Sequence, residues 1–248
     1  MCKEEIKIIK YCKGVERREE DLLIQEVSFT IYVNDKRIGT LSALPFHLRE
    51  LTIGFLFSLG IINREEDISS FFLDRKTYTA KVYIPKFSEP SEILQISNLE
   101  CDFSSAQYGI KDMGDLIFPK EIFSLMRELQ ERGDLFFTTG GTHGAALAVP
   151  SGIMYFAEDI GRHNAIDKVI GMMLLNKREP YPTILLTTGR ISSEIVRKAG
   201  LAHIPILISH SAPTSLSVKC AQKIGLTLIG FAREERFNIY VGEKRVNR

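Results

Sequence analysis

The C-terminal half of the sequence alternates apolar, strand-like runs with amphipathic helical patterns, and this order constrains the fold more than any other feature. The runs TILLTTG (183–189) and IPILISH (204–210) are each followed by a segment with apolar residues three or four apart. Continuous apolar strands that alternate with helices are typical of a partly parallel sheet covered on both faces. The pattern therefore predicts an α/β domain.

Further elements are predicted in the same half. A helix is expected at 120–133, a β-hairpin at 145–157, where PSG joins AALAV to IMYFA, and a last pair of strands at 226–231 and 237–242. The helix after the hairpin has its apolar face at Ile166, Val169, Ile170, Met173 and Leu174.

The N-terminal half has a different pattern. Alternating apolar residues predict a strand over 23–33, which the turn NDKR joins to a second strand over 38–44. A helical pattern follows Pro45, and alternation returns at 77–85. These features indicate a small α+β module.

The segment 97–119 is rich in small and polar residues and follows neither period, which predicts a loop or an interdomain connection. We therefore expect two domains. The first is an α+β domain over 1–115 with a loop that contains Cys101 at its end, and the second is an α/β domain over 116–248. A chain of 248 residues is long enough to bury a core without disulfide or metal staples.

The chain is nearly neutral, with 32 Lys and Arg against 31 Asp and Glu. No overall field favours nucleic acid or an anionic membrane, so we expect neither as a partner, and any recognition of anions has to be local. The first 23 residues alternate charges with short apolar runs. They do not resemble a signal peptide or a membrane span, and we expect a cytoplasmic protein.

The four cysteines are widely scattered. Cys2 and Cys12 fall in an N-terminal stretch that we expect to be a mobile tail, and Cys220 falls on the apolar face of a predicted helix, where it serves packing. No Cys-x-x-Cys pair occurs, so neither a zinc ribbon nor a disulfide framework is indicated.

Four polar segments lie where strands meet helices. They are TTGGTHG (138–144), EDIGRHN (158–164), TTGRISS (187–193) and SHSAPTS (209–215). In open α/β sheets, ligands bind at the carboxyl ends of the strands, where backbone N–H groups and helix N-termini are exposed. With Arg162 and Arg190 as fixed positive charges, the segments predict a site for an anion or a nucleotide.

Other interpretations of these segments stay open. Gly, Ser and Thr at strand–helix junctions also serve as ordinary turns and caps, and no segment is a phosphate loop. His143 and His163 have no serine or cysteine at a motif spacing that would make either one the base of a nucleophile, which favours a hydrogen-bonding role. The zinc deaminase elements His-x-Glu and Pro-Cys-x-x-Cys are missing, so we expect no zinc or other metal.

Five long motifs, in this order, resemble the FdhD/NarQ family of formate dehydrogenase accessory sulfurtransferases. They are TGGTHGAAL, EDIGRHNAIDKVIG, LLTTGRISSEIVRKA, SAPTSLSV and GLTLIGFAREERFNIY. In the N-terminal half VND, LRELTIGFL and GII support the match, so the resemblance extends from about Glu26 to the last strand.

The resemblance implies both a fold and a function. The fold is α/β, with a cytidine-deaminase-like three-layer α/β/α core and a smaller N-terminal α+β domain, and the protein is a homodimer. The implied function is that of an accessory sulfurtransferase, which accepts sulfur from a cysteine desulfurase as a cysteine persulfide. It delivers this sulfur to bis-molybdopterin guanine dinucleotide before that cofactor enters formate dehydrogenase.

The resemblance also implies site residues. Cys101 would carry the sulfur, while the polar turns and the IGFARE stretch would bind the guanine nucleotide, for which GDP is a mimic. The nucleotide-binding residues would be Thr139, Gly140, Gly141, Thr142, His143, Asp159, Gly161, Arg162, His163, Asn164, Gly189, Arg190, Ser211, Ile229, Gly230, Phe231, Ala232, Arg233 and Glu234.

The sulfur-carrying loop departs from the family pattern. The family has Cys-Gly-x-Cys-Gly, and the matching loop reads ECDFSS (100–105), so that Ser104 stands at the second cysteine. A serine cannot carry sulfur or resolve a disulfide, which excludes a relay between two thiols in this loop. A single-cysteine sulfur carrier and a cofactor-binding chaperone without sulfur transfer therefore both stay open. A nucleotide hydrolase or deaminase is disfavoured because its metal ligands are missing.

Overall fold

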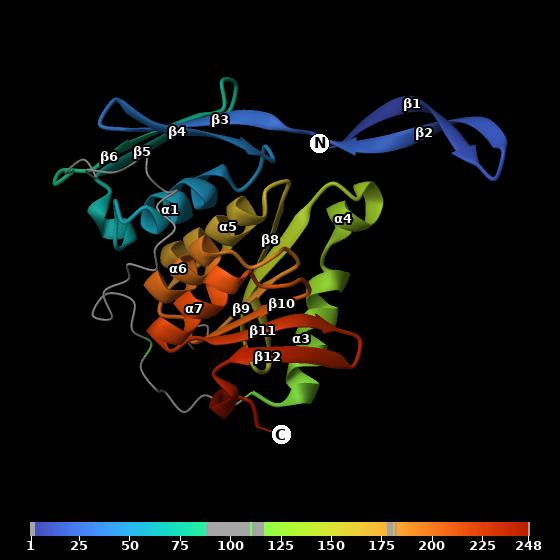
Figure 1. Cartoon of the computed structure of the whole chain (residues 1–248). Coiled ribbons are helices and arrows are strands. Elements are labelled where there is room, and N and C mark those ends of the chain that lie inside the picture. Colours follow the sequence, from blue (N-terminus) through green and yellow to red (C-terminus); the bar gives the residue numbers. More distant parts are fainter. Residues whose placement is uncertain (1–2, 88–109, 111–116, 178–180, 182, 248) are drawn as a thin grey trace.

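A six-stranded mixed sheet forms the centre of the protein (Figure 1). The computed structural model describes residues 3–87, 110, 117–177, 181 and 183–247. In the order β12-β11-β10-β9-β7-β8, the strands are β12 (Arg236–Val241), β11 (Thr227–Arg233), β10 (Ile206–Ser209), β9 (Ile184–Thr187), β7 (His143–Val149) and β8 (Gly152–Asp159). β9, β10 and β11 are parallel, and the other pairings are antiparallel. The expected partly parallel sheet is confirmed.

Helices cover both faces of this sheet (Figure 1). One face carries α5 (Arg162–Asn176), α6 (Ser193–Leu201) and α7 (Ser215–Ile224), and the other carries α3 (Pro119–Glu131), which is followed by the short α4 (Asp134–Thr139). Successive strand residues point to opposite faces. Leu185 packs in the core with α5, α6 and α7, whereas Ile184 and Leu186 pack in the core with α3. The expected three-layer α/β arrangement is thus present.

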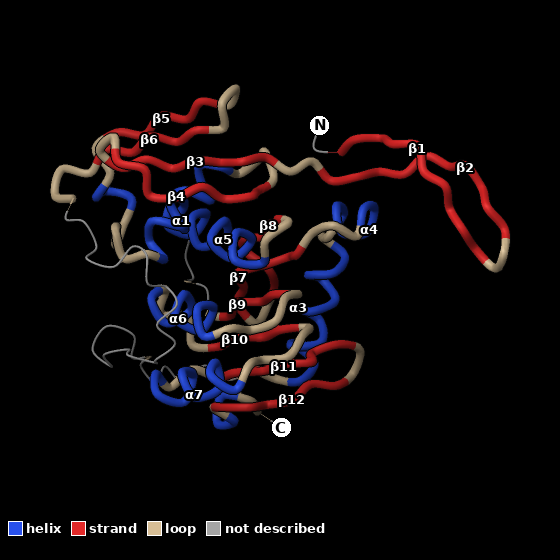
Figure 2. The backbone as a smooth tube through the Cα atoms, turned by 45° about the horizontal axis from the view of Figure 1, so that its top comes forward, coloured by secondary structure: helices blue, strands red, loops and turns tan. Residues whose placement is uncertain are grey.

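A second sheet is built by the N-terminal half. Its order is β4-β3-β6-β5, with β3 (Val27–Val33), β4 (Lys36–Ala43), β5 (Ser70–Asp74) and β6 (Thr79–Tyr83). Asn34 and Asp35 both have positive φ, of 47° and 64°, as the two-residue turn of a tight hairpin requires. α1 (Leu48–Ser58) lies between this sheet and α5 (Figure 2). Short 3-10 helices occupy Glu65–Asp67 and Glu243–Arg245.

Two glycines let α1 and α5 cross in backbone contact. A Cβ atom added at Gly54 in α1 would overlap the backbone oxygen of Asp167 in α5, and one added at Gly171 in α5 would overlap the backbone oxygen of Glu50 in α1. Each helix therefore contributes a glycine at the point where the other presents a carbonyl group. The crossing joins the N-terminal half to the central sheet through one shared hydrophobic core.

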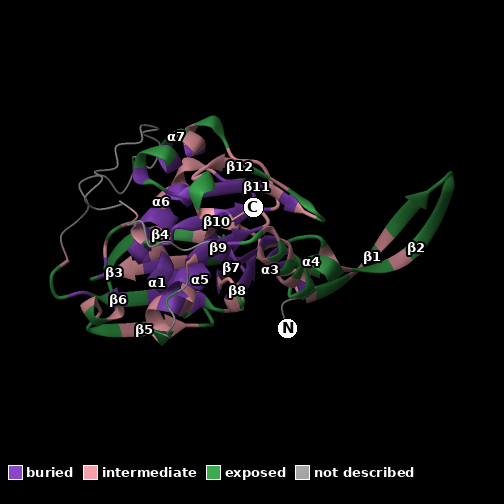
Figure 3. Ribbon diagram, turned by 90° about the horizontal axis from the view of Figure 1, so that it is seen from below, coloured by how far each residue is buried: buried purple, intermediate pink, exposed green. Residues whose placement is uncertain are grey.

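The first residues form an arm instead of a mobile tail. β1 (Lys3–Cys12) and β2 (Val15–Ile24) pair along their whole length in a separate two-stranded sheet, which projects from the body (Figure 3). Lys13 and Gly14 supply the two-residue turn, with φ of 50° and 84°. The tail expectation is wrong for Cys12, which lies in β1, and Cys2 lies outside the described residues.

Most other predicted elements are confirmed. The hairpins β3–β4 and β7–β8, the helices α1, α3 and α5, and the closing strand pair β11–β12 lie where the sequence patterns predict them. The arm, β5 and α4 were not predicted. Of the expected connection at 97–119, the structure describes residue 110 and residues 117–119, and the boundary at 115 stays a prediction.

Gly54→Ala tests the helix crossing. We expect it to lower the free energy of unfolding by about 1–3 kcal/mol, because the new methyl group forces the two backbones apart. Urea unfolding followed by circular dichroism measures the change. Gly39→Ala is the matched control, since a Cβ there would make an ordinary 3.5 Å contact with Phe55 Cζ. It should change the stability by less than about 1 kcal/mol, and equal losses in both variants would contradict the close crossing.

Candidate functional site

The polar segments meet at one edge of the central sheet. β9, β10 and β11 are parallel and end there, and β7 begins there because it runs antiparallel to β9. α5, α6 and α7 begin just after the strand ends at this edge. The structure thus brings parts of all four segments to the edge where α/β proteins bind their ligands.

Hydrogen bonds from hydroxyl groups to the backbone, and one between backbone groups, hold this edge together. The Thr188 hydroxyl lies 3.1 Å from the amide nitrogen of Gly144, from which it accepts a bond, and 3.4 Å from Nδ1 of His143. The Ser211 hydroxyl donates to the carbonyl of Thr188 at 2.8 Å, and the Phe231 amide donates to the carbonyl of Ser211. The ends of β9, β10 and β11 are therefore fixed relative to the start of β7.

Three arginines stand at this edge without a carboxylate partner. Among the residues that the structure describes, Arg162, Arg190 and Arg233 form no ion pair. The Arg162 side chain packs against Gly189, and a Cβ atom added at Gly189 would lie 2.9 Å from the Cβ of Arg162. The Nε of Arg162 is buried and has no hydrogen-bond partner. A buried donor without an acceptor is unfavourable, so this group suits an anionic ligand.

Two helices begin at this edge without a side-chain cap. No side chain caps the N-terminus of α5 or of α6, whereas the Thr214 hydroxyl caps α7 by accepting a bond from the Ser217 amide. Uncapped N-termini present N–H groups and the positive end of the helix dipole. Beside the arginines, they favour a phosphate group over a neutral ligand.

Burial and the neighbouring arginines lower the pKa of two histidines at the edge, His143 and His210. Burial lowers the pKa of His143, and the charges of Arg162 and Arg190 lower it further. Burial and the charge of Arg233 likewise lower the pKa of His210. Both shifts favour the neutral imidazole, which keeps a hydrogen-bonding role for His143.

His163, in the first turn of α5, contacts two residues at the start of α6. Its Nε2 lies 3.3 Å from the Ser192 hydroxyl and 3.2 Å from Oε2 of Glu194. Burial, together with the positive charges of Lys198 and Arg162, lowers the pKa of His163 to about 4. A catalytic triad needs its acid and its nucleophile on opposite nitrogens of the ring, and here both contact the same one. The arrangement does not fit a serine hydrolase.

Asp159 and Asn164 bond to other parts of the protein. Asp159 is fully buried, and its carboxylate contacts Nζ of Lys168 at 2.7 Å. It also accepts bonds from the amides of Leu44 and Gly161 and from the Asn164 side chain. The Asn164 side chain donates in addition to the carbonyl of Ser42 at 2.7 Å.

The first part of the TTGGTHG segment completes α4. Thr139 is the last residue of α4, and its hydroxyl donates to the Leu135 carbonyl. Gly140 ends the helix with φ of 66°, and a Cβ at Gly141 would lie 2.8 Å from Ile24 of the arm. The Thr142 hydroxyl donates to Glu158, which also accepts the Leu135 and Phe136 amides at the start of α4. These groups hold α4 and the arm against the sheet.

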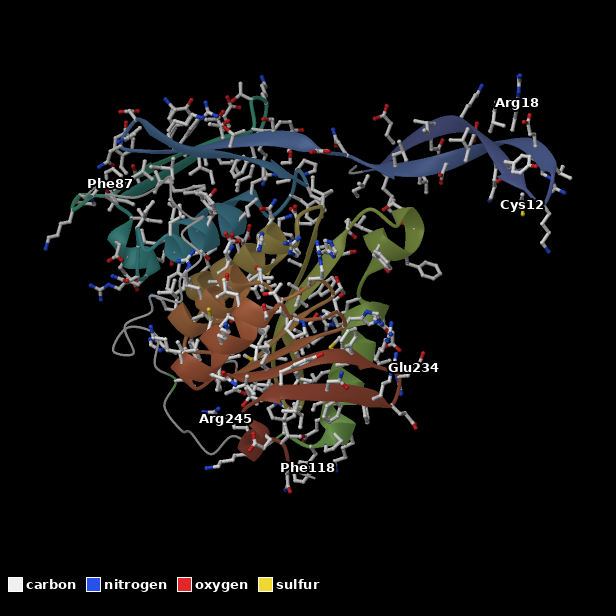
Figure 4. All side chains as sticks on the ribbon, viewed as in Figure 1. Cys12, Arg18, Phe87, Phe118, Glu234 and Arg245 are labelled. Atoms are coloured by element: carbon white, nitrogen blue, oxygen red, sulfur yellow. The ribbon has the colours of Figure 1, made fainter. Side chains whose placement is uncertain are left out.

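The IGFARE stretch divides between the core and the edge. Ile229 and Ala232 are buried in the core with α3. Gly230 packs against Pro213 and the Ser211 carbonyl, and Phe231 has a φ of 54° at an irregularity in the β11–β12 pairing. Arg233 ends β11, and Glu234 lies at the exposed β11–β12 turn (Figure 4). The binding role of these residues stays a prediction.

Cys101 and Ser104 lie outside the described residues. Cys12 is a free, exposed thiol near the tip of the arm. Cys220 is fully buried on α7, as its position on the apolar face predicts, and it takes part in a disulfide, which the sequence did not indicate.

Four residues of the site were missed in the sequence. Thr188, Ser192 and His210 lie within the polar segments 187–193 and 209–215, so the composition of these segments held a signal, but only the sheet topology shows which groups they contact. Glu194 lies just after the segment 187–193, and the spacing of about thirty positions between His163 and its partners Ser192 and Glu194 matches no motif.

The described part of the chain has neither a cluster of metal-ligating side chains nor a membrane-spanning helix. Among these residues, no three or more His, Cys, Asp or Glu side chains lie together in a way that could hold a metal ion. No helix in this part of the chain has the length and apolar character needed to cross a bilayer.

The sequence matches known proteins along most of its length. The FdhD/NarQ family model matches residues 24–247. A sulfur carrier protein FdhD from Geobacillus kaustophilus (strain HTA426) is 35% identical over 250 residues, covering 96% of this chain and 95% of that protein. The protein of the same name from Bacillus subtilis (strain 168) is 32% identical over 250 residues, covering 96% of this chain and 95% of that protein.

A solved structure has the same fold. It is the crystal structure of a formate dehydrogenase accessory protein from Desulfotalea psychrophila, which superposes with a TM-score of 0.84 at 29% sequence identity. The match covers 100% of both chains.

His163 makes the stability depend on pH. Because its pKa is lowered from 6.5 to about 4 in the folded state, the unfolded chain binds the proton more readily, and stability is lost as the pH falls through this range. We expect His163 to account for a loss of about 2 kcal/mol in unfolding free energy between pH 7 and pH 5.

Urea unfolding at both pH values measures this loss. In His163→Asn the pH dependence should shrink by that amount, whereas His203→Asn, at an exposed turn after α6, should keep the dependence of the wild type. A His163→Asn protein with unchanged pH dependence would contradict the lowered pKa.

Proposed function

The chain belongs to the FdhD/NarQ family, and on that basis we propose that it is an accessory protein of formate dehydrogenase that carries sulfur for the enzyme's molybdenum cofactor. The names of its relatives, sulfur carrier protein FdhD and formate dehydrogenase accessory protein, support this role. Formate dehydrogenase and a cysteine desulfurase are the partners that the role requires, and a homodimer is its proposed state.

The proposed cargo is bis-molybdopterin guanine dinucleotide, with the guanine nucleotide part bound at the edge of the central sheet. The observation that carries this proposal is the group of three arginines, Arg162, Arg190 and Arg233, without ion pairs in the described part of the chain. Arg162 also has a buried Nε that needs an acceptor. A diphosphate supplies negative charge and several acceptor oxygens to such donors.

The remaining groups at the edge would orient this cargo. Neutral His143, held near Thr188, can donate or accept one hydrogen bond without adding charge. The N-termini of α5 and α6, which no side chain caps, would offer backbone N–H groups to the same anion.

Cys101 is the proposed sulfur carrier. Its thiolate would attack the outer sulfur of the persulfide on a cysteine desulfurase, forming a new S–S bond while the desulfurase cysteine leaves as a thiolate. The step moves one sulfur atom, consumes no oxidant, and leaves a persulfide on Cys101. With Ser104 at the second family position, that persulfide cannot be resolved by a neighbouring thiol of the same loop.

A second candidate is a chaperone that binds the cofactor and formate dehydrogenase but transfers no sulfur. The loss of the second cysteine at Ser104 favours it, since half of the family's thiol pair is missing. Both candidates need the nucleotide site, and they differ in whether Cys101 is needed.

Guanine nucleotide binding is tested by calorimetry with GDP. We expect Arg162→Gln and Arg190→Gln each to weaken GDP binding roughly tenfold or more, because each removes a charged donor to phosphate. Arg75→Gln, at an exposed turn of the N-terminal sheet, is the matched control and should bind GDP like the wild type. Unchanged affinity in both site variants, or no GDP binding by the wild type, would contradict the site.

Sulfur transfer is tested on Cys101. After incubation with a cysteine desulfurase and cysteine, we expect mass spectrometry to find one added sulfur atom on the peptide that contains Cys101, and Cys12→Ala should keep it. Cys101→Ala should lose it and should fail to restore formate dehydrogenase activity in a strain that lacks its own accessory protein. Full rescue by folded Cys101→Ala would favour the chaperone.

A further inference from the structure

The N-terminal sheet has one open face in the described part of the chain. α1 covers the other face, where β3 buries Phe29, Ile31 and Val33, and no described element lies against the open one (Figures 1 and 2). Serine and threonine are frequent on the open face, as is ordinary for the solvated side of a sheet. One row of side chains across the sheet has a different composition.

Four side chains, one from each strand, form this cation–aromatic row. Arg37 of β4 lies opposite Tyr32 of β3, and Lys81 of β6 is paired with Tyr32 on its other side. Phe72 of β5 lies opposite Lys81. Residues that are paired across neighbouring strands share a face of the sheet. The row therefore alternates a cation with an aromatic ring, and its neighbouring members are about 5 Å apart.

The cation–aromatic row is accessible, and its charges are unpaired. Arg37 and Lys81 are exposed, and neither forms an ion pair with another described residue. Phe72 is 62% exposed. The one acidic side chain in the four described strands, Asp74, accepts the Thr77 hydroxyl in the turn after β5. The row thus presents positive charge and aromatic surface to an external partner.

The spacing of the cation–aromatic row matches the turns of an α-helix. Its two cations, Arg37 and Lys81, are two strands apart, which is about 10 Å. Positions i and i+7 of a helix share one face and are about 10.5 Å apart, with position i+4 between them. A helix that lies along the row can therefore place acidic side chains at i and i+7 on the cations, and apolar side chains at i+4 and i+11 on the rings.

We propose that the cation–aromatic row is the docking site for an acidic amphipathic helix of a protein partner. Carboxylates of this helix pair with Arg37 and Lys81, and its apolar side chains cover Tyr32 and Phe72. Single-stranded nucleic acid also combines negative charge with surfaces that stack on rings, but it is bound along continuous basic grooves. Here each cation is followed by a ring, which favours a partner whose charged and apolar groups alternate in the same way.

This docking site is separate from the proposed nucleotide site. The cation–aromatic row lies in the sheet β4-β3-β6-β5, whereas the arginines of the nucleotide site stand at an edge of the six-stranded sheet. A failure of GDP binding therefore leaves the docking proposal standing, and the reverse also holds.

Fluorescence anisotropy with the full-length protein tests the docking site. The probe is a labelled, alanine-based helical peptide of about twenty residues, with glutamate at i and i+7 and leucine at i+4 and i+11. We expect saturable binding at low salt that weakens as salt is added, since the charge pairs are exposed. A control peptide has its glutamates moved two positions along the chain, to the other side of the helix, and should bind roughly tenfold more weakly. Equal binding of the two peptides, or no binding of either, would overturn the proposal.

Charge reversal separates the cation–aromatic row from the rest of the sheet. Arg37→Glu with Lys81→Glu should weaken peptide binding roughly tenfold or more, since the carboxylates of the peptide then meet like charges. Arg75→Glu with Lys76→Glu is the matched control, because it changes the net charge equally at the β5–β6 turn, outside the row. It should bind the peptide like the wild type. All four positions are exposed, so the fold should persist. Equal losses in the two double variants would contradict a specific site.

The aromatic rings have their own matched pair of variants. Phe72→Ser should weaken peptide binding about tenfold, because the apolar area that a leucine covers is lost. Phe137→Ser, at the 89% exposed position on α4, should leave peptide binding unchanged. Equal effects of the two substitutions would count against the row. Tighter binding of a single-stranded oligonucleotide than of the peptide, abolished by Arg37→Glu with Lys81→Glu, would overturn a protein as the partner.

Discussion

The buried carboxylate of Asp159 fixes the geometry on which the rest of the structure depends. It lies at the end of β8, pairs with the fully buried Lys168 of α5, and accepts the amides of Leu44 and Gly161. One side chain thus connects the central sheet, the first turn of α5 and the N-terminal half. Two buried charges are tolerated only when each has its partner and its remaining hydrogen bonds. Because these bonds are directional, the turn that carries Arg162 and His163 has one position relative to the sheet.

A second buried pair extends this arrangement along α5. Asp167 contacts Lys198 of α6 at 2.6 Å and accepts the hydroxyl of Ser58 at the end of α1. Together the two pairs neutralise charges inside the protein, whereas Arg162, Arg190 and Arg233 at the sheet edge have no such partner among the described residues. The protein therefore separates charges that hold the fold from charges that are available to a ligand.

Periodicity predicted the elements whose side chains face one core. β3 was predicted because Phe29, Ile31 and Val33 alternate, and all three are buried. The arm was missed because no strand residue in it is buried, so charged side chains obscure any alternation, and α4 was missed because six residues are too few for a helical period. The polar turns of the site were visible in the sequence. Contacts such as that of His163 with Ser192 and Glu194 were not, because they depend on which strands are neighbours.

The glycine crossing of α1 and α5 has a consequence for how the chain holds together. Phe29 and Leu51 from the N-terminal half and Ile166 and Ile170 from α5 belong to one hydrophobic cluster. If α1 and the N-terminal sheet were removed, α5 would expose to water the apolar groups that now face them. The two halves are therefore best regarded as one cooperative unit of unfolding, and a fragment that contains the central sheet alone would be prone to aggregate.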